Sequence, residues 1–102
     1  MTESNSTKID VLVSAYWKLI SLMRDKGDER LVAFATTATK SLEQLSEMRA
    51  AQVDAKTTRA MINGLKQGLR EMPKLLSSFF PESYLQLVRE FEESLGQKFS
   101  DF

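Results

Sequence analysis

The side chains that most often do chemistry in small enzymes are missing from this chain of 102 residues, which has no histidine and no cysteine. Histidine is the usual general base near neutral pH, cysteine is the usual thiol nucleophile, and both bind transition metals well. A serine nucleophile would therefore need a lysine base. Ser14 and Lys18 have a helical spacing of four, but both fall on the polar side of their predicted helix, with no oxyanion hole in prospect.

Two further patterns offer little chemistry. Glu43 and Glu47 are four residues apart on a predicted solvated face, where no burial raises a carboxyl pKa. The segment Gly64-Leu-Lys-Gln-Gly68 has a superficial likeness to a phosphate loop, but it lacks the Gly-Lys-Ser/Thr ending and falls inside a predicted helix. We therefore predict no catalytic residue, no cofactor and no metal site, and we expect a protein that is not an enzyme.

A basic helix face is the sharpest surface feature. Residues 54–80 carry five basic and two acidic groups, whereas residues 81–102 carry two basic and five acidic groups. The basic side chains would contact nucleic-acid phosphates or an acidic partner. The alternative is a solvated face that the acidic C-terminal segment partly neutralises. The candidate contacts are Lys56, Arg59, Lys66, Arg70 and Lys74.

A second candidate surface is apolar. The first predicted helix carries more apolar circumference than one neighbour can cover, so it is either central in a bundle or part of a subunit interface. Aromatic residues around Pro81 either anchor an interface or plug the end of the bundle as core residues. The candidate hydrophobic contacts are Val11, Ala15, Trp17, Leu22, Phe79, Phe80 and Tyr84.

The spacing of apolar residues predicts the helices that carry these candidate residues. Apolar residues recur at spacings of three and four from residue 9 to 23, in a helix predicted to begin at an N-cap near Thr7. Gly27 and Asp28 indicate a helix stop and a new N-cap. A second apolar face runs from residue 31 to 48, and Asp54 is expected to cap a third helix after a break.

Glycine and proline residues indicate how the third and fourth helices pack and where they begin and end. Gly64 and Gly68 are expected to permit close packing, and Pro73 is predicted to kink the helix or end it at residue 72. Pro81 is predicted to open the fourth helix, whose apolar face would run from residue 84 to 99. Glu92 falls on that face, either bridging to Arg49 or lying where the helix end is already wet.

These elements predict an all-α fold. We expect a four-helix bundle built from antiparallel helical hairpins, with a short extra turn between helices 3 and 4. Residues 1–6 would form a flexible N-terminal tail and residues 7–102 a single helical domain. The helices are expected to pack around Tyr16, Leu19, Phe34, Leu42, Leu65, Val88 and Phe91.

Composition narrows the function classes further. Net charge is zero, so there is no global steering toward nucleic acid or membrane. The first residues lack the basic-then-apolar order of a secretory signal, and no apolar run approaches the ~18 residues that span a bilayer, so we expect a cytoplasmic protein. We predict a protein–protein interaction module (a regulator, adaptor or assembly factor) that acts as a homodimer and binds a further protein. The alternative is a nucleic-acid-binding protein that uses the basic face.

Overall fold

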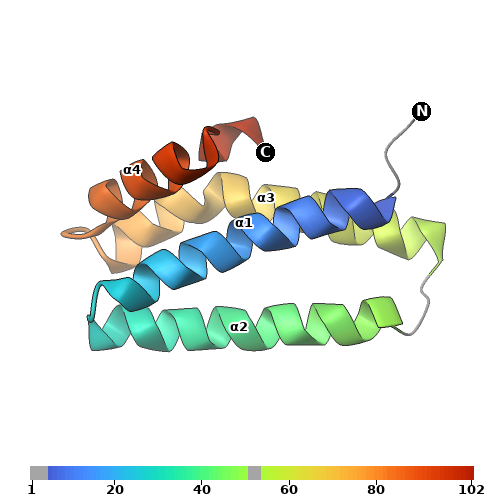
Figure 1. Ribbon diagram of the computed structural model, residues 1–102, viewed down its shortest axis with the longest axis horizontal. Helices are drawn as coiled ribbons and strands as arrows, with labels where there is room; N and C mark the ends of the chain where they lie inside the picture. The colour runs from blue at the N-terminus through green and yellow to red at the C-terminus, as the bar shows by residue number, and fades with distance from the viewer. Residues whose placement is uncertain (1–4, 51–53) are drawn as a thin grey trace.

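The computed structural model describes the backbone of residues 5–50 and 54–102, and the side chains of residues 7–48 and 54–102. These residues form a helical bundle with no strand, which confirms the predicted all-α fold. The first helix packs against the next three and so occupies the middle of the bundle (Figure 1). The elements are α1 (Asn5–Asp25), α2 (Glu29–Ala50), α3 (Ala55–Phe79), α4 (Tyr84–Leu95) and the 3-10 helix η1 (Phe99–Asp101). No helix in the described ranges is long and apolar enough to cross a membrane.

The predicted apolar seam of α1 forms the core. Five of its side chains, Ile9, Leu12, Leu19, Ile20 and Met23, are at most 4% exposed. The predicted N-cap near Thr7 is wrong, because α1 begins at Asn5 and Thr7 lies within its first turn. Its three neighbours cover most of the apolar circumference of α1, but Val11 and Trp17 remain 55% and 41% exposed.

Two acidic caps begin the next helices, as predicted. Gly27 adopts a left-handed φ of 71°, and the Asp28 carboxylate then accepts the Arg30 N–H at 2.8 Å. Asp54 accepts the Thr57 N–H at 2.7 Å at the start of α3. That backbone hydrogen bond lowers the pKa of Asp54, because it favours the carboxylate.

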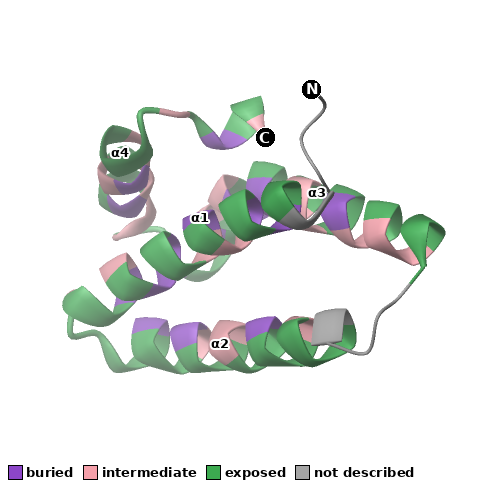
Figure 2. Ribbon diagram, turned by 45° about the vertical axis from the view of Figure 1, so that its right-hand side comes forward, coloured by how far each residue is buried: buried purple, intermediate pink, exposed green. Residues whose placement is uncertain are grey.

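The packing of α2 is one-sided. Its main contact is with α1, and the buried part of α2 faces that helix (Figure 2). Although α2 and α3 follow each other in sequence, they do not pack against each other along their length. The prediction that antiparallel hairpins build the bundle therefore stays a prediction. An apolar groove lies between α2 and α3 as a result.

The prediction that Pro73 ends α3 at residue 72 is wrong, because α3 continues through the proline to Phe79, while the alternative of a kink at Pro73 stays a prediction. A proline inside a helix removes one N–H donor and crowds the preceding turn. Here Leu69, Met72 and Leu76 are buried on either side of it, so packing offsets that cost. Residues 75–79, expected to form the short extra turn between helices 3 and 4, are thus the end of α3. The turn between α3 and α4 spans residues 81–83, and α4 begins at Tyr84 rather than at Pro81.

The predicted apolar face of α4 is wrong at its ends. Leu85 is 66% exposed, whereas Leu87 and Phe91 are fully buried. Gly96 ends the helix with a φ of 63°, which turns the chain back over α4. Phe99 consequently stacks on Phe91 from η1, with ring centroids 4.0 Å apart.

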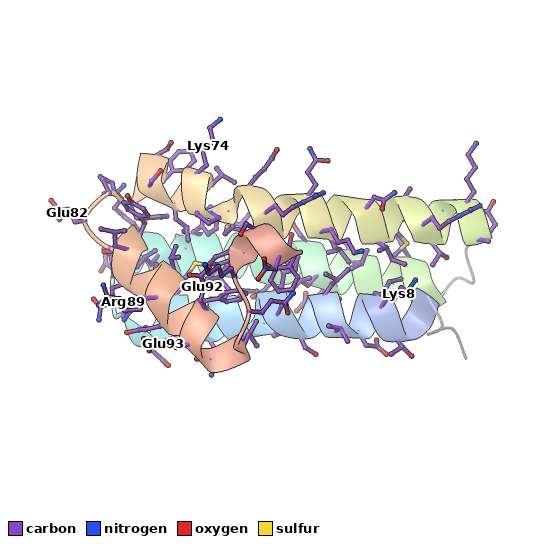
Figure 3. All side chains as sticks on the ribbon, turned by 90° about the horizontal axis from the view of Figure 1, so that it is seen from above. Lys8, Lys74, Glu82, Arg89, Glu92 and Glu93 are labelled. Carbon is purple, nitrogen blue, oxygen red and sulfur yellow. The ribbon has the colours of Figure 1, made fainter. Side chains whose placement is uncertain are left out.

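Glu92 has a structural role at this turn. It is half-buried, and its Oε2 accepts the Phe99 N–H at 3.0 Å. The carboxylate thus binds the backbone at the start of η1 (Figure 3). The side chain of Arg49, its predicted partner, lies outside the described residues.

Candidate functional site

An apolar groove lies between α2 and α3, with α1 as its floor. Its volume is about 350 Å³, and none of the described side chains that line it is charged. Its size and its lining are those of sites that receive a ligand or a partner side chain. Tyr16 contributes the floor, Leu65 and Met72 the α3 wall, and the α2 wall consists of Phe34, Thr37, Ala38, Ser41, Leu42 and Leu45.

The Tyr16 side chain crosses from α1 to α3 beneath the groove. Its hydroxyl donates a hydrogen bond to the Leu65 carbonyl at 3.0 Å. A Cβ at Gly68 would overlap the Tyr16 hydroxyl oxygen, so only glycine admits this contact, whereas Gly64 has open space around it. The expected close packing is therefore present at Gly68 and absent at Gly64. Burial raises the pKa of Tyr16 to about 12, so the phenol stays neutral further into the alkaline range than a free tyrosine.

The hydroxyl groups of the α2 wall have their protons engaged. Thr37 donates to the Ala33 carbonyl at 3.2 Å, and Ser41 donates to the Thr37 carbonyl at 3.3 Å. Like Tyr16, they offer only oxygen lone pairs to an occupant. An occupant that suits the groove is therefore apolar, with hydrogen-bond donors rather than carboxylates at its margin.

One end of the groove is closed by contacts between α2 and α3. The Arg30 guanidinium donates to the Phe79 carbonyl at 2.7 Å and lies 5.3 Å from the centroid of the Phe80 ring. Phe34 meets the same ring edge-on, with centroids 5.8 Å apart. These side chains also line a shallower hollow of about 390 Å³, which continues the groove past Thr37. Among the described residues, Arg30 is the one charged side chain along this combined surface.

An apolar ridge adjoins the closed end. Leu75 and Phe79 follow Met72 at spacings of three and four, so they lie on the same side of α3 as the groove wall. They are 40% and 53% exposed. We call these two side chains the ridge. The groove and the ridge thus share one face of the molecule.

The predicted basic face is present on α3. Lys56, Arg59, Arg70 and Lys74 are exposed, and Lys66 is half-buried. None of the five side chains makes an ion pair within the described residues. Lys74 projects away from α4 and its acidic side chains (Figure 3).

Within the described residues, no acidic side chain of α4 forms an ion pair with this face. Glu90 pairs with Lys26 of α1 at 2.7 Å, and that hydrogen bond lowers the pKa of Glu90. Glu92 binds the backbone of η1.

The predicted hydrophobic contacts are divided by the fold. Val11, Trp17 and Phe79 are exposed, and Leu22 and Tyr84 are half-buried against the core. Ala15 and Phe80 are covered by the chain's own packing. The structure therefore does not bring the seven together on one surface. Of this set, Phe79 alone is an exposed side chain beside the groove.

Sequence reasoning missed the polar groups of the groove. Arg30, Thr37 and Ser41 were not singled out, although hydroxyl residues cluster in α2 at positions 36, 37, 39 and 41. Serine and threonine are poor helix formers, so their frequency around Ala35 and Ala38 could have indicated that this part of the helix has a role other than helix stability.

The weak catalytic candidates stay apart from this site. Ser14, Lys18, Glu43 and Glu47 are exposed, and Gly64 and Gly68 lie inside α3. The described ranges contain no group of three or more acidic side chains placed to hold a metal ion. Comparison with protein-family models, with curated proteins and with solved structures found no match to this chain.

Proposed function

We propose that this protein is a protein–protein interaction module whose groove between α2 and α3 receives apolar side chains from a helix of a partner. The observation that carries the proposal is an apolar groove, uncharged among the described residues, between two helices that do not pack along their length. Helix-in-groove recognition uses such a surface, with anchors at positions i, i+3, i+4 and i+7 of the incoming helix.

The hydroxyl oxygens of the groove determine which residues suit the partner helix beside its apolar stripe. Since Tyr16, Thr37 and Ser41 have donated their protons to backbone carbonyls, a flanking glutamine or lysine gains an acceptor. A flanking glutamate meets only oxygen lone pairs and loses hydration without compensation. The proposed partner helix is therefore apolar on one stripe and free of acidic residues beside it.

Titration calorimetry with two designed helical peptides tests this proposal. Both carry leucine at the anchor positions, one flanked by glutamine and the other by glutamate. We expect the glutamine peptide to bind at least about tenfold more tightly, a difference of about 1.4 kcal/mol. Ser41→Phe fills the groove and should abolish binding, while Ser46→Phe, an exposed serine of the same helix outside the groove, should not. Equal binding by both variants would overturn the proposal.

A second candidate function is nucleic-acid binding by the basic face of α3. The specific support is that the five basic side chains are unpaired within the described residues, while Glu90 and Glu92 of α4 are engaged elsewhere. The face spans residues 56–74, about 27 Å of helix, which is long enough to meet several phosphates. Retardation of a DNA or RNA probe at low salt, lost on replacing Arg59, Arg70 and Lys74 with glutamine, is the expected result. No retardation of the unmodified protein would exclude it.

A further inference from the structure

We infer that the occupant of the groove is a second copy of this chain, bound about a two-fold axis so that the ridge of each copy lies over the groove of the other. This inference rests on the proposed function and names the partner at the same site. It follows from the positions of the groove and the ridge, from their sizes and from the charge of the face that they share.

The relative positions of the two features suit two-fold symmetry. An interface between identical copies joins one surface patch to itself, so the patch must contain both a projection and a matching hollow. Along α3 the groove wall at Leu65 and the ridge at Phe79 are fourteen residues apart, about 21 Å of helix. A two-fold axis between them places each ridge over the opposite groove.

The sizes of the two features are compatible. A cavity of about 150 Å³ holds a benzene molecule, so a groove of about 350 Å³ has room for one phenyl ring and one leucine side chain. Small side chains at Thr37, Ala38 and Ser41 keep the mouth of the groove open to such an insertion. Phe79 is the kind of aromatic anchor that dominates binding energy when it fills a pocket.

The charge of this face also permits self-association. No charged side chain of the described residues lines the groove, and Arg30 is the one described charge in the hollow beside it. Two copies therefore meet there with little of the like-charge repulsion that discriminates against wrong partners. Arg30 is already held by the Phe79 carbonyl and the Phe80 ring of its own chain. The basic side chains of α3 lie on another side of that helix, because Lys66, Arg70 and Lys74 are offset from Leu65, Met72 and Leu75.

Sedimentation velocity measures the association directly. The unmodified protein should form a dimer at micromolar concentration, and Phe79→Ser should weaken the dimer at least about 30-fold. The matched control is Leu85→Ser, which removes a side chain of 66% exposure from α4 and should leave the dimer unchanged. A stable monomer at high micromolar concentration overturns the inference, as does equal weakening by both variants.

Cross-linking tests the geometry, since the chain has no native cysteine. One protein carries Leu75→Cys, which keeps the Phe79 anchor, the other carries Ser41→Cys, and a short bismaleimide reagent is added to their mixture. The mixed product should exceed both same-variant products, because ridge and groove meet only between copies. Replacing Leu75→Cys with Leu85→Cys should remove that excess. Predominant linking of Leu75→Cys to itself contradicts the geometry.

The experiments distinguish failure of the proposed function of the groove from failure of the inference that a second copy occupies it. A monomeric protein that binds the glutamine-flanked peptide keeps the groove as an interaction site and removes the second copy as its occupant. A monomeric protein that binds neither peptide removes both.

Discussion

The two sides of α3 show opposite solutions to helix packing. Toward α1 the contact is closed, because Gly68 lets the Tyr16 side chain lie directly on the helix backbone. Toward α2 the contact is open along most of its length, and apolar side chains line a groove instead of a seam. Both sides carry apolar residues at helical spacing. This difference shows that an apolar stripe predicts which side of a helix faces the protein interior. It does not predict which neighbouring helix covers that side, because close contacts such as that of Gly68 with Tyr16 decide how the helices are placed.

The largest expected effect separates the closed side from the open one. Leu69 of α3 is fully buried, so Leu69→Ala should lower the free energy of unfolding by about 3 kcal/mol through lost burial and a residual cavity. Leu45 is half-buried in the groove wall, and Leu45→Ala should cost about 1 kcal/mol. Urea denaturation measures both values. Similar losses would mean that the groove is as well packed as the core.

The two glycines of α3 form an internal comparison. Gly68→Ala forces the Tyr16 hydroxyl away and should destabilise the protein by about 1–2 kcal/mol, despite the better helix propensity of alanine. Gly64→Ala meets no neighbouring atom and should stabilise it by about 0.5–1 kcal/mol. The sign of the two shifts in urea midpoint is the test. Stabilisation by both substitutions would show that the Tyr16 contact does not constrain α3.

A smaller effect comes from the single hydrogen bond at the floor of the groove. Tyr16→Phe removes the donor to the Leu65 carbonyl, and the expected loss at pH 7 is about 1 kcal/mol. The Leu65 carbonyl keeps its place in α3, so the helix itself should remain. We expect thermal unfolding to show a lower Tm for Tyr16→Phe, while the far-ultraviolet circular dichroism of the folded protein stays unchanged. A loss of helix signal in the folded variant would contradict this expectation.

The same tyrosine predicts a dependence on alkaline pH. Burial raises its pKa from 10.0 to about 12 in the folded protein, so the folded state holds the proton more tightly than the unfolded chain. Its contribution to stability is complete below pH 10 and is lost as the pH rises toward 12. The difference in Tm between the unmodified protein and Tyr16→Phe should therefore shrink over this window. Both proteins keep Tyr84 and every lysine, so a constant difference would show that Tyr16 does not titrate as expected.

Much of the fold was predictable because local signals agreed with the packing. The seam of α1 from Ile9 to Met23 is buried, and Asp28 and Asp54 cap the helices that follow. Pro73 does not end α3, because buried neighbours that a local rule does not count offset its propensity cost. Gly96 was a readable helix stop, and overlooking it placed Phe99 on the wrong element.

The candidate site was harder to predict for a physical reason. The apolar stripe of α2 was visible in the sequence, but the groove exists because α3 does not cover that stripe. The engaged protons of Thr37 and Ser41 likewise depend on backbone geometry. The basic face of α3, by contrast, follows from periodicity alone, and its five residues lie where the sequence placed them.

Amide chemical shifts recorded while the protein concentration is raised test the central claim most directly. The account predicts that the changes concentrate in α2 around Thr37 and Ser41 and in α3 around Leu75 and Phe79. Amides near Trp17 and along the basic face should not move. Changes centred on the exposed side of α1, or none up to the highest soluble concentration, would contradict the claim that the face between α2 and α3 is where this protein binds a second copy of itself.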